Sequence, residues 1–113
     1  MRKPATALLA TALAAAVAVP TANAGSTRTV RLGDDWFVRD GGSTRVTVDR
    51  GTRVRWRWTG RDLHNVVVRR GPTRFQSPLK RSGSYSKTLR RRGTYRIVCS
   101  IHQPDMRMTL RVR

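Results

Sequence analysis

The sequence predicts an all-β fold, a sandwich or barrel of short strands. Short runs along the chain alternate apolar residues with charged or hydroxyl residues, and this period of two is typical of strands with one face on a core and the other in water. Glycine-containing turn signals such as "DGG", "DRG" and "RRGP" separate the runs at the spacing of a sandwich or barrel. No stretch after Gly25 has helical periodicity, and no linker or internal repeat divides the chain.

The first 24 residues have the three parts of a secretory signal peptide. A short basic segment, residues 1–3, precedes an alanine-rich apolar run from Ala5 to Val19. This run is shorter and less apolar than the roughly 20 residues that a membrane span requires, and a small-residue cleavage triplet follows it at residues 22–24. We therefore expect residues 1–24 to be removed and residues 25–113 to form one exported domain, periplasmic or extracellular, without a membrane span.

Seven runs within this domain are predicted strands. In "RVRWRW" the side chains of Val54, Trp56 and Trp58 share one face, so we expect both tryptophans in the core of an antiparallel sheet. The longest irregular segment is 71–84. The predicted strands are 29–32 ("TVRL"), 44–49 ("TRVTVD"), 53–58 ("RVRWRW"), 64–68 ("HNVVV"), 94–99 ("TYRIVC") and 107–112 ("RMTLRV"), with 86–89 ("SKTL") as a weaker candidate.

Cys99 is the only cysteine of the chain, so no disulfide can form within it. A free thiol in an oxidising compartment is either buried as a small apolar side chain or held as a thiolate by a metal. Cys99 ends its strand with the same parity as Tyr95 and Ile97, which predicts that its sulfur points into the core. His102 follows in the loop that leaves the strand, and Met106 comes just before the last strand.

The other histidine, His64, opens the predicted strand 64–68 with inward parity. Two imidazoles, a thiolate and a weak axial thioether are the ligand set of a blue-copper electron-transfer centre. A catalytic zinc site would more naturally use carboxylates and keep a position open for water, and this chain has no glutamate. We therefore predict one type 1 copper ion, Cu(I) or Cu(II), with the ligands His64, Cys99, His102 and Met106.

Several motifs resemble those of the cupredoxins, in particular the plastocyanin, amicyanin and pseudoazurin group. They cover essentially all of residues 25–113: "RLGDDWF", the pattern V-x-V-x-x-G-x-x-V-x-W from Val46 to Trp56, "HNV", "FQSP" and "GTYRIVCSIH" leading into a methionine and a last strand. The resemblance implies a cupredoxin-like Greek-key β-sandwich, two sheets of about seven to eight strands in total, together with one type 1 copper and one-electron transfer, with no catalysis of its own. It also implies that Asn65 ties the two ligand loops together and that the edge of His102 lies in a small apolar surface patch, for which we expect Leu63 and Pro104 as rim residues.

The spacing departs from the family in one place. Three residues separate His102 from Met106, where the family commonly has two or four. Met108 is therefore an alternative axial ligand, although its parity favours a core position and we predict Met106. Val98 also stands where plastocyanins carry a tyrosine close to the cysteine.

A strong positive charge bears on the partners of the protein. Removing Arg2 and Lys3 with the signal peptide leaves 22 basic residues against six acidic ones, a formal charge of +16. We expect a monomer steered toward a redox partner with an acidic docking surface, and toward anionic envelope polymers, by attraction that salt screens. Two other functions stay open, a copper carrier or buffer and a metal-free polyanion-binding module. Specific nucleic-acid binding is not expected, because exposed aromatic residues do not interleave with the arginines.

Overall fold

The computed structural model describes residues 26–38 and 44–113. The predicted signal peptide, residues 1–24, lies outside the described residues. Among the residues described, none forms a helix with the length and apolar character that a membrane span requires. The described chain contains eight strands: β1 (Thr27–Gly33), β2 (Trp36–Phe37), β3 (Arg45–Val48), β4 (Arg53–Trp58), β5 (Val67–Arg70), β6 (Ser84–Thr88), β7 (Gly93–Val98) and β8 (Arg107–Val112).

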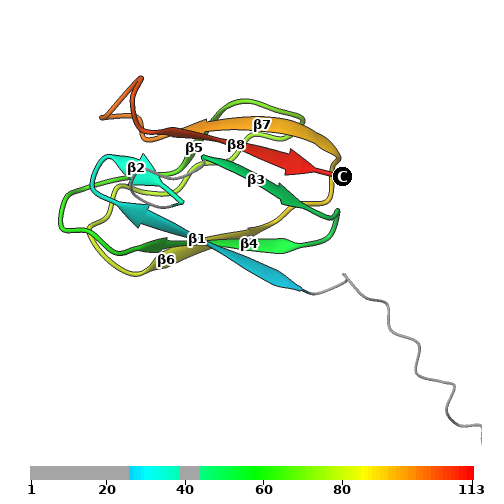
Figure 1. The fold of residues 1–113 in the computed structure, drawn as a ribbon, viewed down its shortest axis with the longest axis horizontal. Coiled ribbons are helices and arrows are strands. Elements are labelled where there is room, and N and C mark those ends of the chain that lie inside the picture. The colour runs from blue at the N-terminus through cyan, green and yellow to red at the C-terminus, as the bar shows by residue number, and fades with distance from the viewer. Residues whose placement is uncertain (1–25, 39–43) are drawn as a thin grey trace, which may run out of the picture.

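The strands form two four-stranded sheets, in the orders β2-β1-β4-β6 and β3-β8-β7-β5, which face each other as a sandwich (Figure 1). The predicted all-β sandwich is confirmed. The run 53–58, which we expected in an antiparallel sheet, is β4, and it pairs with β6 in antiparallel and with β1 in parallel. Strands β3 and β8 also pair in parallel. The chain passes from one sheet to the other between β1 and β3 and again between β3 and β4, so no hairpin fixes the relative direction of these neighbours.

The strands differ most from the predicted ones near the end of the sandwich that carries the histidines. The structure contains β2, which was not predicted, and β5 begins at Val67 rather than at His64. His64 instead forms an isolated antiparallel bridge with Lys80, and Val67 forms one with Gln76. Part of the segment 71–84, predicted as irregular, is therefore paired with the chain that leads into β5.

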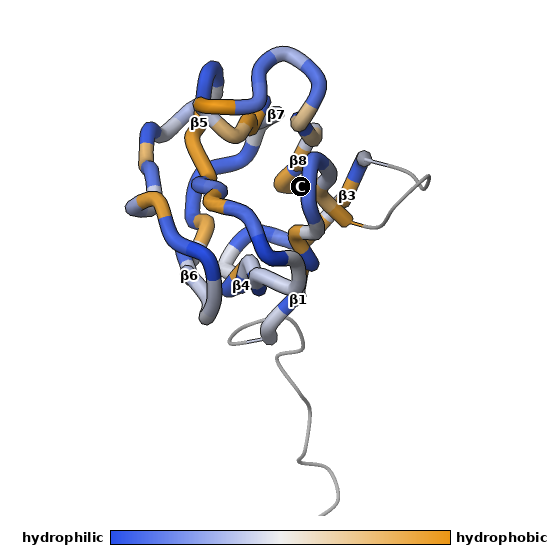
Figure 2. Tube along the Cα trace, turned by 90° about the vertical axis from the view of Figure 1, so that its left-hand side faces the viewer, coloured by the Kyte–Doolittle hydropathy of each residue, from blue (hydrophilic) through white to orange (hydrophobic). Residues whose placement is uncertain are grey.

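The core lies between the sheets, and Figure 2 shows their strands on opposite sides of it. Strand parity predicted which side chains enter it, because Trp56, Tyr95, Ile97 and Cys99 are fully buried and Trp58 nearly so. Aromatic rings fill its centre: Trp56 packs at 5.7 Å from Phe75 and at 6.1 Å from Tyr85, as measured between ring centroids. The rest of the core is mainly aliphatic and includes Val30, Leu32, Val54, Val66, Leu89, Leu110 and Val112.

Candidate metal centre

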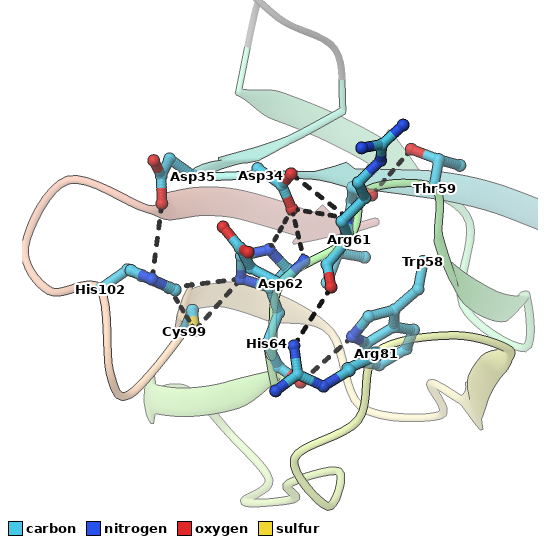
Figure 3. Close-up of polar contacts among 11 residues, drawn as sticks. Asp34, Asp35, Trp58, Thr59, Arg61, Asp62, His64, Arg81, Cys99 and His102 are labelled. Carbon is cyan, nitrogen blue, oxygen red and sulfur yellow. Dashed lines mark hydrogen bonds and ion pairs between the residues drawn. The ribbon is translucent and has the colours of Figure 1, made fainter.

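Three connections meet at one end of the sandwich: the β1–β2 turn, the chain before β5, and the loop from β7 to β8 (Figures 1 and 3). Each contributes side chains to one polar cluster. The β7–β8 loop supplies Cys99 and His102, the chain before β5 supplies His64, and the turn supplies Asp34 and Asp35. These segments are far apart in sequence, so the fold itself assembles the cluster.

The β7–β8 loop is held by its own backbone. The amide of His102 donates to the carbonyl of Cys99 at 3.2 Å, and the amide of Met106 donates to the carbonyl of His102 at 3.0 Å. The amide of Cys99 then closes the loop on the carbonyl of Met106 at 3.1 Å. Because each of these residues bonds to the next, the loop presents Cys99, His102 and Met106 as one unit.

His64 is fixed by its backbone on two sides. Its amide and carbonyl both pair with Lys80, each at 3.1 Å, and its carbonyl also accepts a hydrogen bond from the indole Nε1 of Trp58 at 3.1 Å. The side chain of His64 is completely buried. A ring held in this way loses little further freedom when it binds an ion, which favours tight binding.

The side chains of His64, Cys99 and His102 converge with their ligand atoms within 4.8 Å of one another. The two Nδ1 atoms are 3.3 Å apart, and the Sγ of Cys99 lies 3.4 Å from Nδ1 of His102 and 3.9 Å from Nδ1 of His64. Metal bonds to nitrogen and sulfur of about 2.0 and 2.3 Å in a trigonal plane would separate these atoms by about 3.5 to 3.7 Å. The observed spacing therefore fits a single ion bound to all three atoms.

Asn65 connects the two ligand segments as expected. Its side-chain amide donates to Oγ of Ser100 at 2.9 Å, and its carbonyl oxygen accepts from the amide of Ser100 at 2.8 Å. Asn65 is almost fully buried, so water does not compete effectively for these bonds. The pair fixes the residue after His64 against the residue after Cys99.

Asp34 supports His64 from the side opposite Cys99. Its Oδ1 lies 3.1 Å from Nε2 of His64 and also accepts the amides of Arg61 and Asp62, each at 3.0 Å. The bond from the Asp62 amide, followed by that from His64, holds the pKa of the Asp34 carboxyl below its ordinary 3.8. Since an ionised carboxylate only accepts, Nε2 of His64 donates to Asp34, and Nδ1 is the ring nitrogen that faces the thiol.

The chain wraps closely around this carboxylate because residue 60 is a glycine. A Cβ atom on Gly60 would lie 2.2 Å from Oδ1 of Asp34, which no side chain tolerates. Asp35, in the left-handed region at φ 71°, places its own carboxylate 3.5 Å from Nε2 of His102. The sequence analysis did not identify either aspartate, and their only signal was their place in the turn "GDDW".

The two candidate axial ligands differ in their surroundings. Met106 is completely buried and belongs to the loop that carries His102. Met108 is also buried, and both methionines belong to the core cluster, but Met108 lies on β8 opposite Ile97. Met106 therefore belongs to the ligand loop itself, whereas Met108 belongs to a strand of the second sheet.

The imidazole of His102 forms the edge of the site that reaches solvent. Its side chain is 29% exposed, whereas that of His64 is 1% exposed. Of the two expected rim residues, Pro104 is exposed and Leu63 half-buried. Ile101, which the sequence analysis did not select, is 50% exposed next to His102 and adds to the apolar surface there.

Comparisons with known proteins were informative only at the level of structure, since no family model and no curated protein matches the sequence. A reduced single-site mutant of amicyanin matches with a TM-score of 0.66 and 23% identity, over 80% of this chain and 85% of that chain. A second amicyanin mutant, in its Cu(I) form at pH 4, matches with a TM-score of 0.65 and 24% identity over the same shares. The chain has the cupredoxin fold.

A larger protein carries the same cupredoxin fold as one part of its chain. A copper-containing nitrite reductase from Thermus scotoductus matches with a TM-score of 0.64 and 27% identity over 75% of this chain. The match spans only 22% of the length of the reductase. In the present cupredoxin fold, the His64, Cys99 and His102 cluster has the donor types and the spacing that a type 1 copper ion requires.

Proposed function

We propose that this protein is an exported electron carrier that holds one type 1 copper ion through His64, Cys99, His102 and Met106. The convergence of two imidazole Nδ1 atoms and one thiol on a single point carries the proposal. The fold it shares with copper-binding amicyanin structures supports it. The proposed export rests on the predicted signal peptide alone.

The residues of the chain hold the ligand atoms rigidly and leave the His102 ring accessible to a partner. Bound copper supplies one-electron chemistry by alternating between its Cu(I) and Cu(II) states. The buried His64, fixed by Asp34 and Lys80, and the closed β7–β8 loop keep the donor atoms in one geometry for both states, so little rearrangement accompanies each electron. The partly exposed ring of His102 provides a route from the site to a partner at the surface.

We propose no reaction other than electron transfer. The thiol of Cys99 is completely buried, so it acts as a ligand rather than as a nucleophile toward a substrate. The likeness to a nitrite reductase concerns a small share of that enzyme and gives this chain no substrate site. A charge of +16 on residues 25–113 favours partners with an acidic docking surface, with the protein acting as a monomer.

Voltammetry combined with metal-release kinetics tests the proposal against a copper carrier or buffer. An electron carrier gives a reversible one-electron couple and retains copper for many redox cycles when a chelator is present. The burial of all candidate ligands except His102 favours such retention. Rapid transfer of copper to the chelator, together with an irreversible couple, would instead assign the protein to metal delivery.

A further inference from the structure

The outer face of the second sheet carries a groove of 420 Å³ over β5, β7 and β8. Four arginines line it, Arg69, Arg70, Arg96 and Arg107, and none of the described residues that line it is acidic. Its size is within the range of sites that bind small ligands, roughly 300 to 1,000 Å³. The β7–β8 loop also lines the groove, through Gln103 and Pro104.

The strand register brings like charges together in this groove. Arg70 on β5 pairs directly with Arg96 on β7, and Arg96 faces Thr109 on the other side. Like charges at directly paired positions destabilise a sheet. The fold gains nothing from this arrangement, whereas an anion bound between the two guanidinium groups would offset the repulsion.

The described residues provide no counter-ion for the arginines of the groove. The ion pairs within residues 26–38 and 44–113 join Asp34 to His64, Asp35 to His102 and Asp49 to Arg113. The guanidinium group of Arg69 donates to the side-chain oxygen of Gln103, and that of Arg107 reaches the carbonyl of Pro104 at 3.5 Å. Arg69 and Arg107 are therefore held by neutral groups, and within the described residues no ion pair neutralises any of the four arginines.

The position of the groove relates it to the metal centre. Gln103 and Pro104 belong to the loop that carries His102, and Gln103 also lines a second hollow together with His102, Asp35 and Asp105. An acidic segment of a partner would therefore sit on the arginines and not in this second hollow, which has two carboxylates of its own. A molecule seated on the arginines thus lies beside the exposed edge of His102. That edge is where an electron would leave the protein.

We infer that these four arginines form the docking site for an acidic segment of the redox partner, which places the partner beside His102. This inference rests on the proposed function. Carboxylates match the forked guanidinium geometry and accept two hydrogen bonds from each arginine. Complexes between electron-transfer proteins have small interfaces and short lifetimes, and charge complementarity between the two surfaces sets their association rate and orientation. An anionic polymer would gain nothing from lying next to His102, so the position favours a protein partner.

Binding of a labelled polyglutamate peptide to the copper-loaded protein tests this inference. The double variant Arg70→Gln/Arg96→Gln is compared with Arg55→Gln/Arg57→Gln, which loses the same charge from exposed positions of β4 in the other sheet. We expect the groove variant to bind the peptide about tenfold more weakly and the control less than about threefold more weakly. Peptide-induced NMR shifts should centre on the groove and on Gln103.

Each outcome bears on a different part of the argument. Equal loss of affinity in both variants, with the copper spectrum of each intact, would overturn the groove and leave the proposed function standing. Preference of the groove for single-stranded DNA or heparin over polyglutamate at equal charge and salt would also overturn it, in favour of a polymer. If only the groove variant loses affinity for the peptide, but the protein forms no blue copper centre, the proposed function is overturned. The proposed electron-transfer partner is then overturned with it.

Discussion

Asp34 Oδ1 lies 3.1 Å from Nε2 of His64, and through this contact a turn between two strands of the first sheet fixes a ring that faces Cys99. The carboxylate is itself held by the amides of Arg61 and Asp62. A carboxylate on the outer nitrogen of a ligating histidine fixes the tautomer of the ring and makes its other nitrogen a better donor. Asp34 is thus a positioning residue for the metal centre.

Asp34→Asn should lower the affinity for Cu(II) about 10- to 100-fold, the range found when partners of ligating histidines are removed. The asparagine removes the negative charge and cannot accept as many bonds from the surrounding amides. The measurement is a competition titration with a chelator, accompanied by the reduction potential, which should rise because Cu(II) loses more stabilisation than Cu(I). Asp49→Asn, which removes the same charge beside Arg113, is the control and should change neither.

The Asn65–Ser100 pair should matter to the stability of the metal-free protein. Asn65→Ala removes two hydrogen bonds and leaves the Ser100 amide without its side-chain partner, so we expect a loss of about 1 to 3 kcal/mol in the free energy of unfolding. Ser100→Ala removes one of the two and should cost about 1 kcal/mol. Urea unfolding measures the free energy of unfolding of both variants. Equal losses in Asn65→Ala and Ser100→Ala would argue against a role for the bond from the Ser100 amide to the Asn65 side chain.

Replacing each methionine by leucine separates the two candidate axial ligands. Met106→Leu removes a thioether from the ligand loop, so we expect altered visible absorption and a raised reduction potential. Met108→Leu exchanges one buried side chain for another of similar volume in β8, at a cost below about 1.5 kcal/mol, and should leave the spectrum unchanged. A spectrum that responds only to Met108→Leu would transfer the axial role to β8.

Burial raises the pKa of Tyr85 above its ordinary 10.0. A phenol that is harder to ionise in the folded protein keeps its proton longer there than in the unfolded chain. The raised pKa therefore contributes to the free energy of unfolding. This contribution is complete below pH about 10 and is lost as the pH rises through the pKa of Tyr85 in the folded protein. Unfolding experiments between neutral and alkaline pH should show a steeper loss of stability for the natural protein than for Tyr85→Phe, and parallel curves would contradict the shift.

Strand parity was enough to predict the buried tryptophans and the inward thiol of Cys99. The convergence of His64, Cys99 and His102 was predicted from their chemistry as copper ligands, and the sandwich from the resemblance to cupredoxins. The pattern could not predict that His64 precedes β5, because that depends on pairing with Lys80 in a segment without strand periodicity. The parallel strand pairs could not be predicted either. The alternation of apolar and polar residues specifies the face on which a side chain lies but not the direction of the neighbouring strand. Asp34 and Asp35 could not be assigned because a turn motif does not say which residues from other segments it contacts.

Addition of Cu(II) to the purified protein, followed by visible spectroscopy, tests the central claim most directly. The convergence of Cys99 with His64 and His102 predicts strong blue absorption from thiolate-to-copper charge transfer at one ion per chain, lost in Cys99→Ser. A colourless complex, or a blue colour that survives in Cys99→Ser, would contradict a type 1 centre at these residues.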